Sequence, residues 1–126
     1  MPSLFLVMIG GAIGAGGRHL VGRLALALLG NGYPWGTLAV NLIGGFAMGV
    51  LAATLTRFDN LAGEQARLLL GVGVLGGFTT FSSFSLEVVV MAERGQWALA
   101  LGYVLASASG AIVALALGLA TGRALA

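Results

Sequence analysis

Four long apolar stretches fill almost the whole chain, and only a few residues separate each stretch from the next. An α-helix rises ~1.5 Å per residue, so about 20 apolar residues are enough to cross the hydrocarbon core of a bilayer. The stretches meet this length and predict spans over residues 3–29, 36–56, 66–91 and 97–122. We therefore expect an all-α membrane protein with one transmembrane domain over residues 1–126.

Charged residues are too scarce to cover a water-facing surface. They make up 8% of the chain, six basic and four acidic, whereas soluble proteins carry about 25%. The arginines are scattered and form no basic stripe, so the sequence gives no reason to expect nucleic-acid binding. With no cysteine and one histidine, we expect neither thiol chemistry nor a transition-metal site. No nucleophile–base pair is visible, and we expect no enzyme.

The third apolar stretch is interrupted near its middle by the segment GGFTTFSSFSLE at 76–87. Gly76 and Gly77 permit backbone conformations that a helix forbids. Irregular backbone at membrane depth is tolerated only where it is buried in protein or lines a wet cavity, and broken helices often build ion sites there. The pattern predicts a third helix that is broken at mid-membrane, with the break as the functional centre.

The residue types at this interruption suit ions of both signs. Backbone carbonyls freed at a break would suit a hard cation such as Na⁺. Phe81 and Phe84 would present ring edges, which carry partial positive charge, to a small anion. Hydroxyl groups beside them could donate to the same anion or merely cap the broken backbone; they belong to Thr79, Thr80, Ser82, Ser83 and Ser85. Each residue alone has a structural explanation, and it is their combination that favours an ion site.

Polar residues in the other spans extend the candidate site. Asn41 either hydrogen-bonds to a neighbouring helix or donates to a pore. Arg18 lies deep in the first span, where it either snorkels to the interface or faces a water-filled vestibule. His19 has no predicted partner, and we expect it at the membrane interface. Tyr103 and Ser107 are four residues apart and share one helical face.

Glu87 is the only acidic residue deep in an apolar stretch, which makes it a functional candidate. Three roles stay open for it: relaying a proton, pairing with Arg18, or approaching the interface near Met91.

The arginines are almost balanced between the two sides that four spans create. The side of the termini holds Arg57, Arg67 and Arg123, and the other side holds Arg23 and Arg94, with Arg18 as a third if it is counted. Because so small a bias gives little preference for one orientation, the chain should insert both ways. Two oppositely oriented copies would form an antiparallel homodimer with the inverted symmetry of larger transporters. Four short spans are also too few to enclose a conduit easily.

The segment GGFTTFSSFSLE at 76–87 resembles the signature of the Fluc/CrcB family of fluoride channels. TLAVNLIGGF at 37–46 and GGAIGAGGRH at 10–19 are similar to the family's other motifs in order and spacing, so the resemblance covers the whole chain. It implies a fluoride-selective channel that passively exports fluoride from the cytoplasm. It also implies a dual-topology antiparallel homodimer with two pores, placed in the inner (plasma) membrane as a multi-pass protein.

The resemblance also implies roles for individual residues. The backbone carbonyls of Gly76 and Thr79 would bind a structural, central Na⁺, Arg18 would lie in a vestibule, and Glu87 would lie near the polar track. The chain departs from the family at Ala111, where the polar track would otherwise continue. The fluoride pore would be lined by Asn41, Phe81, Phe84, Thr80, Ser83, Tyr103 and Ser107.

Two other classes of function stay open on the residues alone. A small dual-topology, proton-coupled multidrug transporter shares the size, the span count and the charge balance. It needs an acidic residue in its binding pocket, typically in the first span, and Glu87 is the only substitute here. A membrane assembly subunit would explain the glycines but not the clustered hydroxyls and phenylalanines.

Overall fold

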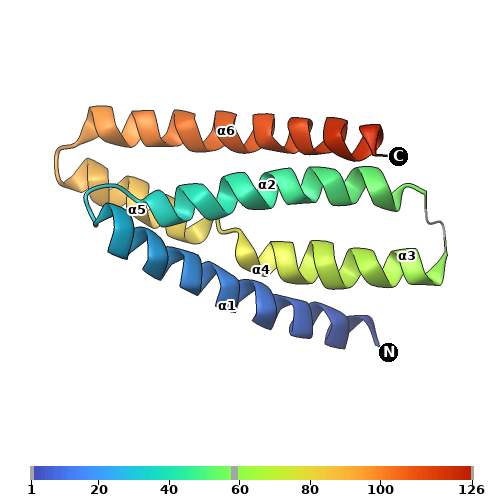
Figure 1. Cartoon of the computed structure of the whole chain (residues 1–126). Coiled ribbons are helices and arrows are strands. Elements are labelled where there is room, and N and C mark those ends of the chain that lie inside the picture. The colour runs from blue at the N-terminus through green and yellow to red at the C-terminus, as the bar shows by residue number, and fades with distance from the viewer. Residues whose placement is uncertain (1, 58–59, 126) are drawn as a thin grey trace.

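The computed structural model describes residues 2–57 and 60–125, and the described chain is built of helices joined by short turns (Figure 1). Within these described residues, four helical segments are long and apolar enough to cross a membrane, as predicted. The third of them is divided into several parts. In chain order the elements are α1 (Ser3–Leu29), α2 (Trp35–Leu55), α3 (Leu61–Ala66), η1 (Arg67–Leu75), α4 (Gly76–Phe78), α5 (Ser82–Glu93) and α6 (Trp97–Ala124).

The third span begins earlier than predicted, because the polar segment before residue 66 is partly helical. Asn60 is extended and caps α3, with its Oδ1 accepting from the Gly63 N–H at 2.8 Å. Glu64 then pairs with Arg67 at 2.7 Å on the exposed surface. These local bonds let a polar segment that lies outside the predicted spans start the helix. Asp59, which lies between the second and third predicted spans, is outside the described residues.

Glycines let the helices approach backbone to backbone in two seams. In the first, α1 packs along η1 and α4, and a Cβ on Gly10 would lie 2.8 Å from the Gly73 Cα. In the second, α2 packs along α6, and a Cβ on Gly45 would lie 2.9 Å from the Ala111 carbonyl oxygen. Close approach at small residues is the usual way in which helices associate in lipid. Gly10 and Gly45 thus let the first two spans lie directly against neighbouring helices.

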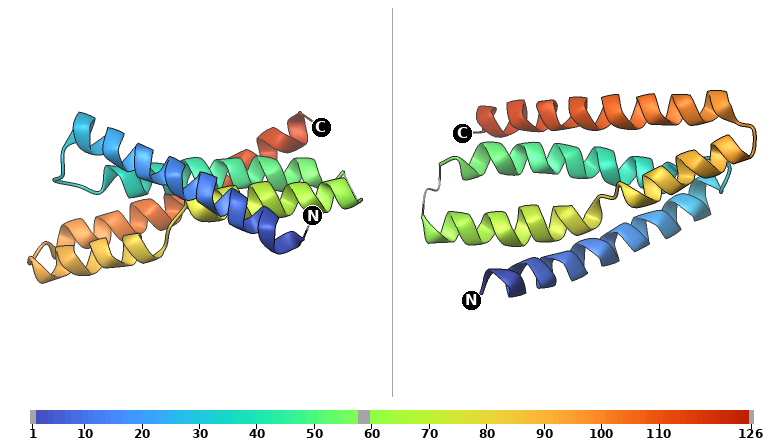
Figure 2. Two further views of the ribbon diagram at one scale, coloured as in Figure 1. Left: turned by 90° about the horizontal axis from the view of Figure 1, so that it is seen from below. Right: turned by 180° about the vertical axis from the view of Figure 1, so that it is seen from behind.

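Both chain ends lie at the same end of the bundle, as an even number of spans requires. Figure 1 places the N- and C-termini at one end of the bundle and the α1–α2 and α5–α6 turns at the other. The views in Figure 2 show that α5 follows the first half of α6, while the end of α1 diverges from this pair.

The break in the third helix is present, but the predicted role of the glycine pair is wrong. Gly76 is helical, with φ −63° and ψ −38°, and Gly77 continues α4. The backbone becomes extended only at Thr79, with φ −87° and ψ 159°. Gly77 is required for packing instead, since a Cβ there would lie 2.6 Å from the Gly11 carbonyl oxygen.

Candidate functional site

Asn41 on α2 hydrogen-bonds to both the carbonyl and the N–H group of Thr80 in the break. Its Nδ2 donates to the Thr80 carbonyl at 3.1 Å, and its Oδ1 accepts from the Thr80 N–H at 3.0 Å. One side chain thus replaces two helical hydrogen bonds that the break removes. The interhelical bond that we left open for Asn41 is therefore present. The second hydrogen of the same amide group is not used in this pair.

Three hydroxyl groups at the break hydrogen-bond to the backbone. The Thr79 hydroxyl donates to the Leu75 carbonyl at 2.9 Å, and the Ser85 hydroxyl donates to the Phe81 carbonyl at 2.8 Å. The Thr80 hydroxyl accepts from the Ser83 N–H at 3.2 Å, which caps the first turn of α5. Capping, the structural alternative that we weighed for these hydroxyls, is confirmed for Thr80. The Thr79 and Ser85 hydroxyls instead bond back to carbonyls that already accept from the N–H groups of the same residues.

These side-chain bonds divert the amides that would otherwise satisfy two backbone carbonyls. In a helix the Gly76 carbonyl would accept from Thr80 N–H, but that group donates to Asn41. The Thr79 carbonyl would accept from Ser83 N–H, but that group donates to the Thr80 hydroxyl. Unwound carbonyls of this kind coordinate Na⁺ in other membrane proteins. The Gly76 and Thr79 carbonyl oxygens are ligands of the kind that the predicted Na⁺ requires. Two oxygens from one chain are too few to surround the cation.

A cavity of about 360 Å³ lies between α2, the break and α6. On α6 it is bounded by Ser107, which is only 5% exposed. The Ser107 hydroxyl has no hydrogen-bond partner among the residues that the structure describes. Ala111 also lines the cavity and is apolar, so the polar lining of α6 ends at Ser107. The predicted pore residues that meet in this cavity are Asn41, Thr80, Phe81, Phe84 and Ser107.

The two phenylalanines have different surroundings. Their ring centroids are 5.6 Å apart, with an angle of 44° between the planes. Phe84 also contacts the Tyr103 ring at a centroid distance of 5.1 Å. Phe81, by contrast, is 79% exposed in the single chain. The Phe84 ring is thus packed within the chain, and the Phe81 ring is exposed.

Glu87 accepts two hydrogen bonds from hydroxyl groups of neighbouring helices. Thr37 Oγ1 on α2 donates to Oε2 at 3.0 Å, and Tyr103 Oη on α6 donates to Oε1 at 2.9 Å. Over residues 2–57 and 60–125 there is no ion pair between Glu87 and Arg18, so that alternative is wrong. Sequence reasoning missed Thr37. Its position four residues before Asn41, on the same face of α2, was the available signal.

Arg18 lies against the other side of the break. Its Nε donates to the Gly77 carbonyl at 3.2 Å. It also lines a cavity of about 300 Å³ together with His19, Arg23 and Thr80. Three side chains that are basic in character therefore meet at one opening beside the break. Ser83 and Gly76 do not line the cavities at Ser107 or at Arg18.

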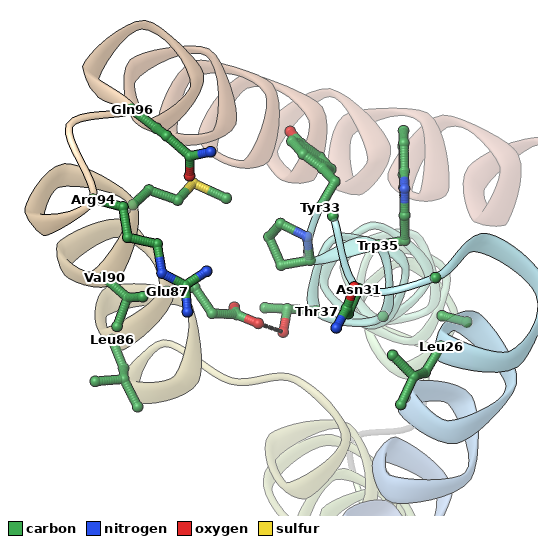
Figure 3. Close-up of a pocket in the computed structure, with 17 residues that line it drawn as sticks. Leu26, Asn31, Tyr33, Trp35, Thr37, Leu86, Glu87, Val90, Arg94 and Gln96 are labelled. Atoms are coloured by element: carbon green, nitrogen blue, oxygen red, sulfur yellow. Dashed lines mark hydrogen bonds between the residues drawn. The ribbon is translucent and has the colours of Figure 1, made fainter.

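A third cavity, of about 400 Å³, opens at the turn end of the molecule (Figure 3). The Glu87 carboxylate and the Thr37 hydroxyl lie at its inner end, and Arg94 and Gln96 come from the α5–α6 turn. The α1–α2 turn supplies Tyr33, whose ring packs on Trp35 at a centroid distance of 4.6 Å. The Glu87 network is thus reached through a cavity that carries charges of both signs.

Comparison with known proteins gives consistent results. Residues 5–119 match the family described as "CrcB-like protein, Camphor Resistance (CrcB)". A protein of Sphingopyxis alaskensis is 56% identical over 94% of each chain, and one of Chelativorans sp. is 57% identical over 94% of each chain. A protein of Mesorhizobium japonicum is 51% identical over 99% of each chain. All three carry the name fluoride-specific ion channel FluC.

Proposed function

Because the chain belongs to the CrcB-like family, we propose that it is a fluoride-selective ion channel that lets fluoride leave the cytoplasm passively across the inner (plasma) membrane. Its relatives are named as ion channels, which are not enzymes, and the four apolar helices make it a multi-pass membrane protein. The observation that carries the proposal is the buried Ser107 hydroxyl, which has no partner in the described chain and borders the cavity at the break.

The chemistry of this cavity suits a small anion. Fluoride is tightly hydrated, so a selective pore must replace its water with closely placed donors. A buried hydroxyl without a partner costs free energy, and a ligand that accepts from it removes that cost. The cavity also offers the unused amide hydrogen of Asn41 and the ring edges of Phe81 and Phe84.

Two features support an antiparallel homodimer around a structural Na⁺. Gly76 and Thr79 supply two backbone carbonyls per chain, so two chains would supply four. Phe81 is exposed in one chain and would be covered by the other. The cation would not permeate, and it would set a positive field near both pores.

The dimer and the cation can each be tested directly. Accessibility labelling of a C-terminal tag should find it on both faces of the membrane, and a single orientation would exclude the antiparallel arrangement. Exchange of Na⁺ for a larger cation should lower fluoride flux, whereas unchanged flux and assembly would exclude the central cation.

The proposed activity is tested by fluoride efflux from proteoliposomes that contain the purified parent chain, Ser107→Ala or Ser85→Ala. Ser107→Ala should lower efflux without lowering thermal stability, because its hydroxyl makes no bond in the described chain. Ser85→Ala is the matched control, since its hydroxyl already bonds within α5. Absence of fluoride efflux from the parent would contradict the proposal, and efflux that requires a proton gradient would support the multidrug-transporter class.

A further inference from the structure

Arg94 lines the cavity above Glu87, and the proposed pore does not use it. Figure 3 shows its side chain extending back along α5 into this cavity, toward the Glu87 carboxylate. We propose that Arg94 draws anions into the cavity at the turn end and so sets the rate at which they reach Thr37, Glu87 and Tyr103. This inference rests on the proposed function and adds an electrostatic entrance residue to it.

The backbone fixes the place of Arg94. Gly95 has φ +78°, and its N–H donates to the Ala92 carbonyl at 3.0 Å. The next amide, Gln96 N–H, donates to the Met91 carbonyl at 2.9 Å. This pair of bonds around a left-handed glycine is a Schellman turn, which ends the helix sharply. Arg94 is therefore the last residue before a defined turn and holds a set position at the rim.

The charge of Arg94 is available to an incoming ion. Within the described residues the one ion pair joins Glu64 and Arg67, so Arg94 has no carboxylate within 4.0 Å. The inner end of the cavity carries the negative charge of Glu87, which on its own would repel an anion. A cation at the rim offsets that charge, and narrow openings concentrate such fields. An arginine near a membrane surface often binds lipid phosphate instead, but this side chain points into the cavity.

The Arg18 cavity adjoins this one and adds to the same effect. The two cavities share four lining residues, Gly22, Leu26, Gly36 and Thr37. Positive side chains thus approach the Thr37–Glu87 pair from two directions, Arg18 from α1 and Arg94 from the α5–α6 turn. An anion that enters at Arg94 meets the Thr37 hydroxyl at the boundary between both cavities.

The chain contains no cysteine, so Arg94→Cys creates a single thiol whose charge can be chosen afterwards. The purified variant is treated with a methanethiosulfonate that adds either a trimethylammonium group or a sulfonate group, and fluoride efflux from proteoliposomes is measured at low ionic strength. We expect the positive group to restore efflux toward the parent rate and the negative group to lower it about tenfold, the lower end of the effect of focused fields on entry rates. High salt should shrink the difference.

Two controls separate this role from a structural one. Arg123→Cys, at the far end of α6, should respond much less to the same two reagents. Arg94→Lys should keep most of the efflux, while Arg94→Gln should lower it.

Three results would overturn the inference. The first is equal efflux with both reagents while the parent conducts fluoride. The second is a difference that vanishes when anionic lipids are left out, since it would assign Arg94 to an anionic lipid headgroup. The third is a parent that does not conduct fluoride, which would remove the proposed function itself.

Discussion

The two halves of the third span are held in the molecule by different forces. The half before the break packs on α1 through glycines, and Gly73 lies directly against Gly10. The half after the break is held by polar and aromatic contacts. Glu87 accepts from Thr37 and Tyr103, and the Phe84 ring packs on the Tyr103 ring. Backbone packing positions the first half, and side-chain donors position the second.

This difference separates stability from transport along one helix. Glycine contacts offer no donor to an anion, so the first half can fix where the break lies and supply a carbonyl to a cation, but it cannot bind fluoride. Hydroxyls, amides and ring edges in and around the second half can hold the helix or bind an ion, but each donor hydrogen makes only one bond at a time. We therefore expect changes in the first half to affect folding and changes in the second half to affect fluoride flux.

The largest effect is expected at Gly14, in the seam between α1 and the first half. A Cβ there would collide with the Val74 carbonyl oxygen, which belongs to backbone and cannot rotate away. Gly14→Ala should therefore cost about 3 kcal/mol or more, the upper end for overpacking. Thermal unfolding and the monodisperse fraction on size-exclusion chromatography measure this loss.

Gly16→Ala is the control on the same helix, because nothing in the chain lies within 4 Å of its added Cβ. Its stability should be unchanged or slightly higher, since alanine favours helix over glycine. Equal losses in both variants would show that the seam is not what positions the first half.

A smaller loss of stability and a complete loss of transport are expected at Asn41, where the two halves meet. In Asn41→Asp the carboxylate can still accept from the Thr80 N–H but cannot donate to the Thr80 carbonyl. One unpaired carbonyl should cost about 1–3 kcal/mol, and the negative charge should repel fluoride. Unfolding and efflux are measured on the same preparation. Parent-like efflux would show that Asn41 only holds the broken backbone through its hydrogen bonds to Thr80.

The smallest effect on stability is expected at the two phenylalanines. Phe84→Ile loses the aromatic contact with Tyr103 and should cost about 0.5–1.5 kcal/mol. Phe81→Ile should cost less, because that ring is 79% exposed in the chain. Both variants should lose fluoride efflux, since isoleucine has no ring edge. If both conduct like the parent, ring edges do not bind the anion.

Much of the fold was predictable from the sequence. Long apolar stretches separated by a few residues specify the spans, and the cluster at 76–87 marks the break. The residue at which the helix breaks within this cluster was not predictable, because a glycine needed for packing, such as Gly77, looks the same as one needed for a turn. Only the distance to Gly11 on another helix distinguishes the two uses.

The candidate site was predictable in its residue types and only partly in its pairings. Phe81, Phe84 and the hydroxyls stand out because such residues are unusual in the middle of a span. The bonds from Thr37 and Tyr103 to Glu87 depend on how α2, α5 and α6 meet, which periodicity along one helix does not encode. The same holds for the Arg18 bond to Gly77, which crosses from α1 to α4.

The bond pair between Asn41 and Thr80 has a consequence for the order of biosynthesis. The two residues are 39 positions apart, and Asn41 is made first. Asn41 therefore reaches the membrane before Thr80 does, so its amide is available when the unpaired peptide group of the third span arrives. A third span that entered the bilayer alone would expose that group to hydrocarbon. Insertion of the broken helix is thus coupled to the span synthesised before it, and a nascent chain lacking Asn41 should stall at the translocon.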